Sequence, residues 1–483
     1  MLKNFSKQYS ILILKIKTMK TNIITICLLF LTLTALSQNI TGIWNGAIEV
    51  DKDTKFNFIF NIKENGKTYQ TTVDIPTQRV NGIKALKTLV TADSLIIDFS
   101  NVGMKYSGKF NTNRTLINGK LVEGLNSFSL NLSRNSVLET PKLNRPQEPL
   151  KPYSYIEEKV SFVNKDANIK LAGTFTRPKE NKKYPVAILI SGSGPQDRDE
   201  TISQHKPFLV LADYLTKQGI AVLRYDDRGF GASTGNHSRA TTYDFALDVI
   251  SAIDYLRTRH DVDANKIGLI GHSEGGIIAP LVANKADNVA FIISLAGTGI
   301  SGTELSVIQS KTMRPFPVPD EAVYEKAIRE AIKIAKQNKD ISVIKPELME
   351  HYNETIAPIL KNLGVPEVKV NEIITSLVAM RTTKWVRYFY DYNPADEYEK
   401  VNCPVLSLNG SLDTQVEAKI NQNGLRNALT NGKNKDFEII ELEGFNHLFQ
   451  KAKTGKMDEY RDIEETFSPK VLNIISDWIL KRV

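Results

Sequence analysis

The chain has 483 residues, of which 41% are hydrophobic and 24% charged, and these are ordinary values for a soluble globular protein of two or three domains. The formal net charge is +8, but five lysines and no acidic residue fall within residues 1–37, so the remainder carries only +3. This small excess gives no reason to expect a nucleic-acid partner, and there is no repeat at solenoid or propeller spacing.

Residues 1–37 have the pattern of a secretory signal peptide. After Lys20, an apolar run from Ile23 to Leu36 spans about 14 residues, which suits a signal-peptide core and is short for a bilayer span of ~20 residues. Ala35-Leu36-Ser37 is a small-x-small cleavage site. We expect cleavage after Ser37 and no stable membrane span afterwards, and a retained N-terminal anchor is the alternative.

Two further features bear on export. Met19 directly precedes Lys20, so we expect translation to start there. Cys27 would be removed with the signal peptide, which leaves Cys403 without a partner for an intramolecular disulfide. An exported protein without disulfides is more typical of a bacterial periplasm than of a eukaryotic exterior. The predicted location is therefore secreted or periplasmic, in a bacterium.

Residues 38–134 are predicted to form a small antiparallel β domain, either a barrel or a sandwich. Between residues 55 and 62 every second residue is Phe or Ile, and such alternation is typical of a half-buried strand. Glu64-Asn65-Gly66 and Asn118-Gly119 are predicted as hairpin turns, because Asn-Gly tolerates positive φ angles. Residues 135–152 contain four prolines among polar residues and are predicted as a linker.

From residue 153 to 483 the pattern predicts an α/β domain with a mostly parallel sheet. Apolar runs that suit strands buried on both faces alternate with helical patterns. These runs are residues 186–190, 220–223, 267–270, 290–295, 404–408 and 437–442. Residues 303–398 contain no such run and carry three apolar stripes at helical spacing, so they are predicted as a helical cap over the working edge of the sheet.

The segment Gly271-His272-Ser273-Glu274-Gly275 has the G-x-S-x-G pattern of a nucleophile elbow. A serine hydroxyl needs exposure on a sharp turn and a base that takes its proton, and the crowded turn admits only small residues at positions 271 and 275. The predicted strand at residues 267–270 and the predicted helix at residues 276–283 supply the required context. Ser273 is therefore the predicted nucleophile, and a simple glycine turn is the alternative.

The base and the acid are expected after the nucleophile. His447 follows the last predicted strand, at the sheet edge where Ser273 should lie, whereas His351 lies in the helical segment and is expected to be solvated. Asp413 follows the strand at residues 404–408 and would hold the imidazole of His447 in the correct tautomer. Glu441 and Glu443 are poorer candidates because they lie within or just after the last predicted strand.

The oxyanion of a tetrahedral intermediate needs preorganised donors. The backbone N–H of Glu274, directly after the nucleophile, is one candidate. The second is expected from the loop after residues 186–190, with the N–H of Ser193 preferred over that of Gly194.

Three segments around these residues resemble the α/β-hydrolase superfamily, and the resemblance covers residues 153–483. Residues 191–199 (SGSGPQDRD), 226–231 (DDRGFG) and 413–416 (DTQV) are similar to segments of bacterial secreted esterase-like hydrolases related to the serine aminopeptidase and prolyl-oligopeptidase groups. The resemblance implies a serine hydrolase without cofactor and a structural role for Asp227-Arg228-Gly229. In the β domain, Gly42-x-Trp44-x-Gly46 resembles the lipocalin-like module that precedes such hydrolases in some Bacteroidetes proteins.

Three functions follow as alternatives. The preferred one is a carboxylesterase that acts on small-molecule esters. The second is a serine peptidase of the aminopeptidase or prolyl-oligopeptidase type, which would hold a substrate amine with cap carboxylates such as Glu321, Glu325, Glu330, Glu347 and Glu350. The third is a non-catalytic protein whose β module binds a glycan or a lipid. No metal-site spacing and no complete dinucleotide motif occur, so neither a metal nor a nicotinamide cofactor is expected.

Aromatic residues gather at the end of the predicted cap. Trp385, Tyr388, Phe389 and Tyr392 share one face of a helix through their i, i+3, i+4 and i+7 spacing. This face is predicted either to dock the cap onto the sheet domain or, through Trp385 and Phe389, to line an acyl pocket.

Overall fold

The computed structural model describes residues 40–49, 55–66, 68–76, 80–123, 126–134, 144–314 and 316–483. The predicted signal peptide lies outside these residues, as does the predicted linker up to residue 143. The chain divides into two compact units, residues 1–142 and residues 143–483, and the division falls within the predicted linker. Within the described ranges, no helix is both long and apolar enough to cross a membrane.

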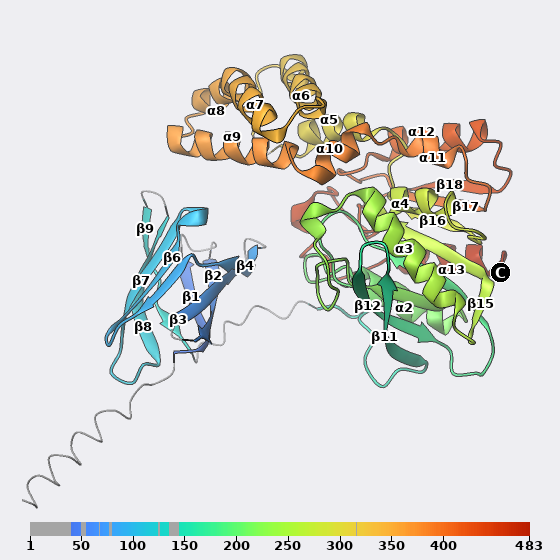
Figure 1. The fold of residues 1–483 in the computed structure, drawn as a ribbon, viewed down its shortest axis with the longest axis horizontal. Coiled ribbons are helices and arrows are strands. Elements are labelled where there is room, and N and C mark those ends of the chain that lie inside the picture. The colour runs from blue at the N-terminus through green and yellow to red at the C-terminus, as the bar shows by residue number, and fades with distance from the viewer. Residues whose placement is uncertain are drawn as a thin grey trace, which may run out of the picture. The chain divides into compact units, whose positions relative to one another are not determined.

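The first unit is an antiparallel sheet (Figure 1). Its described strands are β1 (Gly42–Glu49), β2 (Lys55–Asn65), β3 (Thr68–Ile75), β4 (Val80–Lys84), β5 (Lys87–Val90), β6 (Ser94–Phe99), β7 (Met104–Phe110), β8 (Leu116–Glu123), β9 (Asn126–Ser129) and β10 (Leu132–Ser133). The order is β4-β3-β2-β1-β10-β8-β7-β6-β5, with β9 on β8. The sheet curls until β3 meets β5, where the hydroxyls of Thr71 and Thr88 lie 2.8 Å apart.

The alternation along β2 fills the interior of this curled sheet. Phe58, Phe60 and Ile62 are buried there together with Trp44, whose Nε1 donates to the carbonyl oxygen of Ile40 at 2.9 Å. The predicted turn before Thr68 is present, since Gly66 has a φ of +61° and β2 and β3 pair on either side of it. The all-β prediction for this part of the chain is therefore confirmed.

The prediction of a turn at Asn118-Gly119 is wrong, because both residues lie inside β8 and pair with β7. The turn lies at residues 111–115, where the Asn111 side chain accepts the N–H of Thr115 at 2.9 Å. Gly119 serves packing instead, since a Cβ at this position would collide with the buried phenol of Tyr106. A glycine in a strand can thus mark a close approach of another group as well as a turn.

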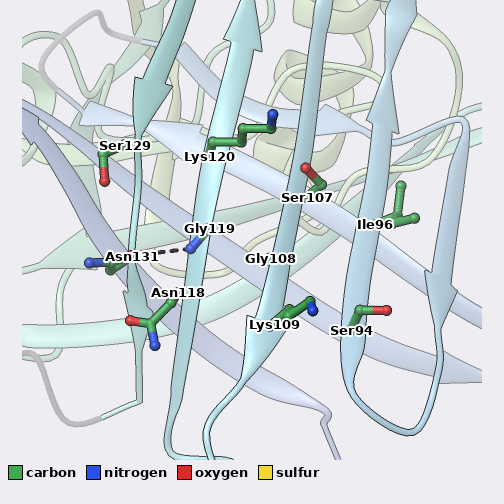
Figure 2. A pocket seen from close by; sticks show the side chains of 10 residues that line it. All are labelled: Ser94, Ile96, Ser107, Gly108, Lys109, Asn118, Gly119, Lys120, Ser129 and Asn131. Carbon is green, nitrogen blue, oxygen red and sulfur yellow. Dashed lines mark hydrogen bonds between the residues drawn. The ribbon is translucent and has the colours of Figure 1, made fainter.

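A shallow hollow of about 530 Å³ lies over strands β6 to β9 (Figure 2). Short polar side chains and two lysines line it, together with one isoleucine and two glycines. These residues are Ser94, Ile96, Ser107, Gly108, Lys109, Asn118, Gly119, Lys120, Ser129 and Asn131. The lining contains no histidine and no carboxylate, so none of the predicted catalytic residues belongs to it.

The second unit is built on an eight-stranded sheet. Its strands are β11 (Ile156–Asn164), β12 (Ile169–Arg177), β13 (Tyr184–Ile190), β14 (Ala221–Tyr225), β15 (Val262–His272), β16 (Ile292–Leu295), β17 (Val405–Gly410) and β18 (Phe437–Leu442), in the order β11-β12-β14-β13-β15-β16-β17-β18. Strands β13 to β18 pair in parallel, as the apolar runs predict, and β11 and β12 add an antiparallel edge. Strand β11 alternates polar and apolar residues. The search for continuous apolar runs therefore did not predict it.

Helices cover both faces of this sheet. They are α2 (Pro207–Lys217), α3 (Thr242–Arg257), α4 (Glu274–Ala283), α12 (Ala418–Asn431) and α13 (Pro469–Leu480). Helices α3, α4 and α12 share one apolar cluster with the sheet, and α2 and α13 share the other. Alternate residues of β13 enter the two clusters, Ile188 the first and Leu189 the second, so the strand is buried on both sides.

A helical insert separates β16 from β17. It consists of α5 (Gly302–Thr312), α6 (Glu321–Lys336), α7 (Ile341–Thr355), α8 (Ala357–Asn362), α9 (Glu367–Arg381), α10 (Lys384–Asp391) and α11 (Pro394–Tyr398). Helices α6 to α9 gather around a core of their own (Figure 1). Helices α5 and α10 connect them to α4, because Leu305 and Phe389 pack against Ile277.

Candidate active site

Ser273 lies at the turn between β15 and α4, in the place predicted for a nucleophile. Its backbone is in a strained conformation with φ 51° and ψ −111°, which a non-glycine residue rarely adopts. Its side chain is partly exposed, whereas His272 and Glu274 on either side are buried. The N–H of Ser273 donates to the carbonyl oxygen of Leu295 at 2.8 Å, which fixes the turn to the end of β16.

The two glycines of the motif make this turn possible. A Cβ at position 271 would collide with the carbonyl group of Gly275, and a Cβ at position 275 would collide with the carbonyl oxygen of Ile190 on β13. The strand, the helix and the neighbouring strand therefore approach one another through main-chain contact. Gly271 and Gly275 are required by this packing, as the G-x-S-x-G pattern predicts.

His447 and Asp413 lie together at the carboxyl edge of the sheet, in the loops after β18 and β17. The Nδ1 of His447 donates to Oδ2 of Asp413 at 2.6 Å, and both side chains are buried. The other carboxylate oxygen of Asp413 accepts the N–H groups of Gln415 and Val416 at 2.8 and 2.9 Å. The acid is thus held in one orientation, and its bond leaves Nε2 of His447 as the nitrogen that can accept a proton.

The loop of His447 reaches the elbow through His272. The ring of His272, next to Ser273, lies with its centroid 4.7 Å from that of the His447 ring. Its Nε2 is 3.0 Å from the carbonyl oxygen of His447. The fold therefore brings the predicted base to the residue adjacent to the predicted nucleophile, although 174 positions of sequence separate His447 from Ser273.

The loop after β13 passes close to Ser273. A Cβ on Gly192 would lie 3.2 Å from the Cβ of Ser273, so glycine permits a close approach here. The N–H of Gly192 donates to Oε1 of Glu200 at 2.8 Å and is not available to a substrate. The next two N–H groups, of Ser193 and Gly194, remain the candidates for the second oxyanion donor. The first candidate, Glu274, begins α4, and the first N–H groups of a helix have no partner within it.

Two carboxylates at the end of β14 hold this loop in place. Asp227 accepts the Ser191 hydroxyl at 2.7 Å and the N–H of Gln196 at 2.9 Å. Asp226 accepts two hydrogen bonds from the Arg198 guanidinium, from Nε at 2.9 Å and from Nη2 at 2.7 Å. Burial raises the pKa of Asp227 to about 8; the negative charges of Glu274 and Glu200 act in the same direction, and the bonds from Ser191 and Gln196 oppose it. These contacts give Asp227 the bracing role that the resemblance implies.

The side chain of Glu274 faces the helical insert. Its Oε1 accepts the hydroxyl of Thr242 at 2.7 Å and the indole Nε1 of Trp385 at 2.6 Å. Burial raises the pKa of this carboxyl, and the bonds from Trp385, Thr242 and Ser193 lower it by less. Trp385 stacks on Phe389, with ring centroids 5.2 Å apart. Both rings belong to one cluster with Ile277, so the predicted aromatic face of α10 lies next to α4, the elbow helix.

The sequence prediction missed the pair formed by Glu200 and His272. Oε1 of Glu200 lies 2.8 Å from Nδ1 of His272, and both residues are buried. Glu200 directly follows the SGSGPQDRD segment of residues 191–199. This position is the feature of the sequence that could have indicated a role for Glu200 near the active site. Among the described residues, no group of three or more His, Cys, Asp or Glu side chains is arranged to hold a metal ion.

Comparison with known proteins adds a family match and several relatives. Residues 203–354, which include Ser273, match a family model described as serine aminopeptidase, S33. Esterase EstD of Thermotoga maritima is 27% identical over 328 residues, which is 66% of this chain and 68% of that protein. Dipeptidyl-peptidase 5 of Porphyromonas gingivalis is 30% identical over 142 residues, 28% of this chain and 19% of that one.

Solved structures are also similar to this chain. The esterase Pf2001 of Pyrococcus furiosus superposes with a TM-score of 0.41 at 15% identity, over 68% of this chain and 93% of that one. The α/β hydrolase GrgF from Penicillium superposes with a TM-score of 0.42 at 17% identity, over 68% of this chain and 99% of that one.

Proposed function

Because this chain is a member of the α/β-hydrolase superfamily, we propose that it cleaves carboxylic esters through an acyl-enzyme intermediate on Ser273. The observation that carries the proposal is the 2.6 Å bond between His447 and Asp413, beside a strained serine on a strand-to-helix turn. A serine, a histidine and an acid in these positions have the roles of a catalytic triad.

The chemistry follows from these positions. Nε2 of His447 takes the proton of Ser273 as its oxygen attacks the ester carbonyl carbon, and then gives that proton to the leaving alcohol. Asp413 stabilises the imidazolium that forms between the two steps. The N–H of Glu274 and that of Ser193 or Gly194 stabilise the oxyanion. Water then repeats the sequence on the acyl-enzyme, and the acid leaves.

The charges of the helical insert favour an ester over a peptide amine as the substrate. Four of the five glutamates named as amine ligands form ion pairs with cations of the insert. The pairs are Glu321 with Arg314, Glu325 with Lys311 and Arg329, Glu330 with Lys333, and Glu347 with Lys339. The Glu274 carboxyl, next to the nucleophile, is occupied by Thr242 and Trp385. A substrate ammonium group would have to displace these partners.

The proposal also covers the helical insert, the cellular location of the protein and the β unit. The insert would act as a cap over Ser273, since α10 contacts α4 directly. The protein would be secreted or periplasmic after cleavage of residues 1–37, with no stable membrane span and with neither nucleic acid nor a cofactor as a partner. The β unit would be a lipocalin-like accessory module that leaves the chemistry to the second unit.

A fluorophosphonate probe, which labels activated serines covalently, tests the proposal together with a panel of short and medium esters and aminoacyl amides. We expect labelling and ester hydrolysis by the natural protein, and loss of both by Ser273→Ala with unchanged folding. The loss should be at least ~10³-fold, because only binding and oxyanion contributions remain. Faster cleavage of aminoacyl amides than of esters would favour the peptidase alternative, and a folded Ser273→Ala protein with normal turnover would overturn the assignment.

A further inference from the structure

A second carboxyl–histidine pair lies beside the predicted triad. Nδ1 of His272 lies 2.8 Å from Oε1 of Glu200, and its Nε2 lies 3.0 Å from the carbonyl oxygen of His447. Glu200 is 1% exposed and His272 is 4% exposed. The same Oε1 of Glu200 also accepts the N–H of Gly192 at 2.8 Å.

The partners of the His272 ring define its protonation. A backbone carbonyl oxygen can only accept a hydrogen bond, and so can an ionised carboxylate. Both ring nitrogens of His272 therefore donate, which makes the ring an imidazolium paired with the Glu200 carboxylate. Burial lowers the pKa of His272, but the charge and hydrogen bond of Glu200, the bond to the His447 carbonyl oxygen and the charge of Asp413 together raise it above its usual value.

The backbone around Glu200 is shaped to bury its carboxyl. Glu200, Ser203 and Gln204 have φ values of 51°, 51° and 64°, in the left-handed region that non-glycine residues rarely occupy. Arg145 binds the carbonyl oxygens of Ser203 and Gln204 at 3.2 and 3.3 Å and holds this conformation. Strained residues of this kind persist only where the surroundings determine them, and they concentrate at functional sites.

We propose that Glu200 and His272 are a positioning pair that joins the three loops of the active site. Through Gly192 the pair fixes the loop that carries Ser193, through its own backbone it fixes Ser273, and through the carbonyl group of His447 it fixes the base. The hydrogen bonds given above for the pair join its two side chains to each other, to the N–H of Gly192 and to the carbonyl oxygen of His447, and none of them goes to the Ser273 hydroxyl or to the His447 ring. The inference rests on the proposed function, because it assigns a role in the reaction of Ser273 and His447.

The ion pair makes the protonation of His272 depend on the charge of Glu200. Removal of the charge at Glu200 leaves a buried cation without its partner, and His272 then becomes neutral. One nitrogen of the His272 ring loses its proton, so the ring can no longer donate both to residue 200 and to the carbonyl oxygen of His447. The loops keep their hydrophobic packing but lose a common anchor, and a misplacement of about 1 Å between catalytic groups costs on the order of 10²-fold in rate.

Two single variants and the double variant that combines them test the pair, and a third single variant is the control. Glu200→Gln keeps an acceptor for the N–H of Gly192 and removes the charge, whereas His272→Gln removes the ring. His351→Gln is the matched control, because Nε2 of His351 also bonds a carbonyl oxygen, that of Ala327 at 2.8 Å, but in the helical insert. Each protein is compared by Tm, by kcat and KM on one ester, and by ¹⁵N NMR of histidine-labelled protein.

The expected result is a kcat about 10²-fold lower in Glu200→Gln and in His272→Gln, with KM unchanged, since the pair positions catalytic groups and not the substrate. The double variant should be no worse than either single one. His351→Gln should keep its kcat. In the natural protein at neutral pH both ring nitrogens of His272 should carry protons, and Glu200→Gln should remove one of them.

The NMR measurement on the natural protein depends neither on activity nor on the folding of a variant. A neutral His272 ring in the natural protein would overturn the proposal, and so would an unchanged kcat in the folded variants. Failure of the proposed function is distinguishable from both, because the natural protein would then neither hydrolyse esters nor react with the fluorophosphonate probe at Ser273.

Discussion

The indole Nε1 of Trp385 donates a hydrogen bond to Oε1 of Glu274 at 2.6 Å, and this bond joins the helical insert to the residue directly after Ser273. A packed cluster continues the connection, since Phe389 and Tyr392 of the insert lie against Ile277 of the elbow helix. The hydroxyl of Tyr392 donates to the carbonyl oxygen of Ile277 at 2.9 Å. Substitutions in α10 should therefore separate its docking role from a role in substrate choice.

Phe389→Ala and Trp385→Ala test these two roles. Phe389 is 6% exposed within the docking cluster, so its truncation should lower the free energy of unfolding by about 3–5 kcal/mol and leave the relative kcat/KM for short and medium acyl esters unchanged. Trp385 is only partly buried, and its truncation should shift that ratio. Urea unfolding and ester kinetics check both outcomes, and an unchanged ratio in both variants would exclude an acyl pocket on this face.

His447→Ala should reduce ester hydrolysis at least ~10³-fold, as Ser273→Ala does, and the double variant should be no slower, because the two residues act as a unit. Steady-state kcat for the three proteins is the measurement. Additive losses would show that His447 does not act on Ser273.

Asp413→Asn should be about tenfold less damaging than His447→Ala. The amide oxygen can still accept the N–H groups of Gln415 and Val416, so the NH₂ group turns toward His447. Nδ1 of His447 must then accept, which puts the ring proton on Nε2, where the base needs a lone pair. The rate of fluorophosphonate labelling measures this effect, and full activity of Asp413→Asn would require another acid.

Gly275→Ala should damage the elbow without touching any reactive group. The added methyl group would collide with the carbonyl oxygen of Ile190, so α4 or β13 must shift. Overpacking of this kind costs about 1–3 kcal/mol of stability, and the shift should also move Ser273 away from His447. We expect a lower Tm together with slower labelling. A variant with the Tm and labelling rate of the natural protein would show that position 275 has room for a methyl group.

Stability should depend on pH through His205. This residue is 0% exposed and its Nε2 lies 2.8 Å from the carbonyl oxygen of Tyr460. Burial lowers its pKa to about 4, against 6.5 in an unfolded chain. Between these values the unfolded chain binds a proton that the folded protein does not, so stability is present above pH 6.5 and is lost as the pH falls toward 4.

His205→Gln cannot take up this proton, so its free energy of unfolding should decline less steeply between pH 6.5 and 4 than that of the natural protein. Urea unfolding at several pH values within this window gives the two slopes. Equal slopes would show that His205 does not contribute to the loss.

A chain that begins at Leu143 should keep the serine chemistry. Residues 143–483 form a compact unit with their own apolar clusters, and all three predicted triad residues lie in it. We expect this shortened chain to fold cooperatively and to react with the fluorophosphonate probe at the natural rate. A folded chain that fails to react would show that the β unit completes the active site.

The sequence by itself determined the classes of structure and the residues of the candidate triad. Continuous apolar runs predicted the parallel strands, because strands buried on both faces need apolar side chains at every position. The glycines at positions 271 and 275 predicted the elbow, because local crowding allows no larger residue there. The order of strands then placed Asp413 and His447 at the same sheet edge as Ser273.

Only the tertiary structure decided features that depend on contacts between distant segments. Asn118-Gly119 has the local chemistry of a turn, yet the space needed by Tyr106 places it within β8. Glu200 and His272 look ordinary in the sequence, since a carboxylate and an imidazole 72 positions apart acquire a joint role only when burial brings them together. Local patterns record steric and solvation requirements of neighbouring residues, whereas such partnerships arise from long-range packing, which no short window of sequence contains.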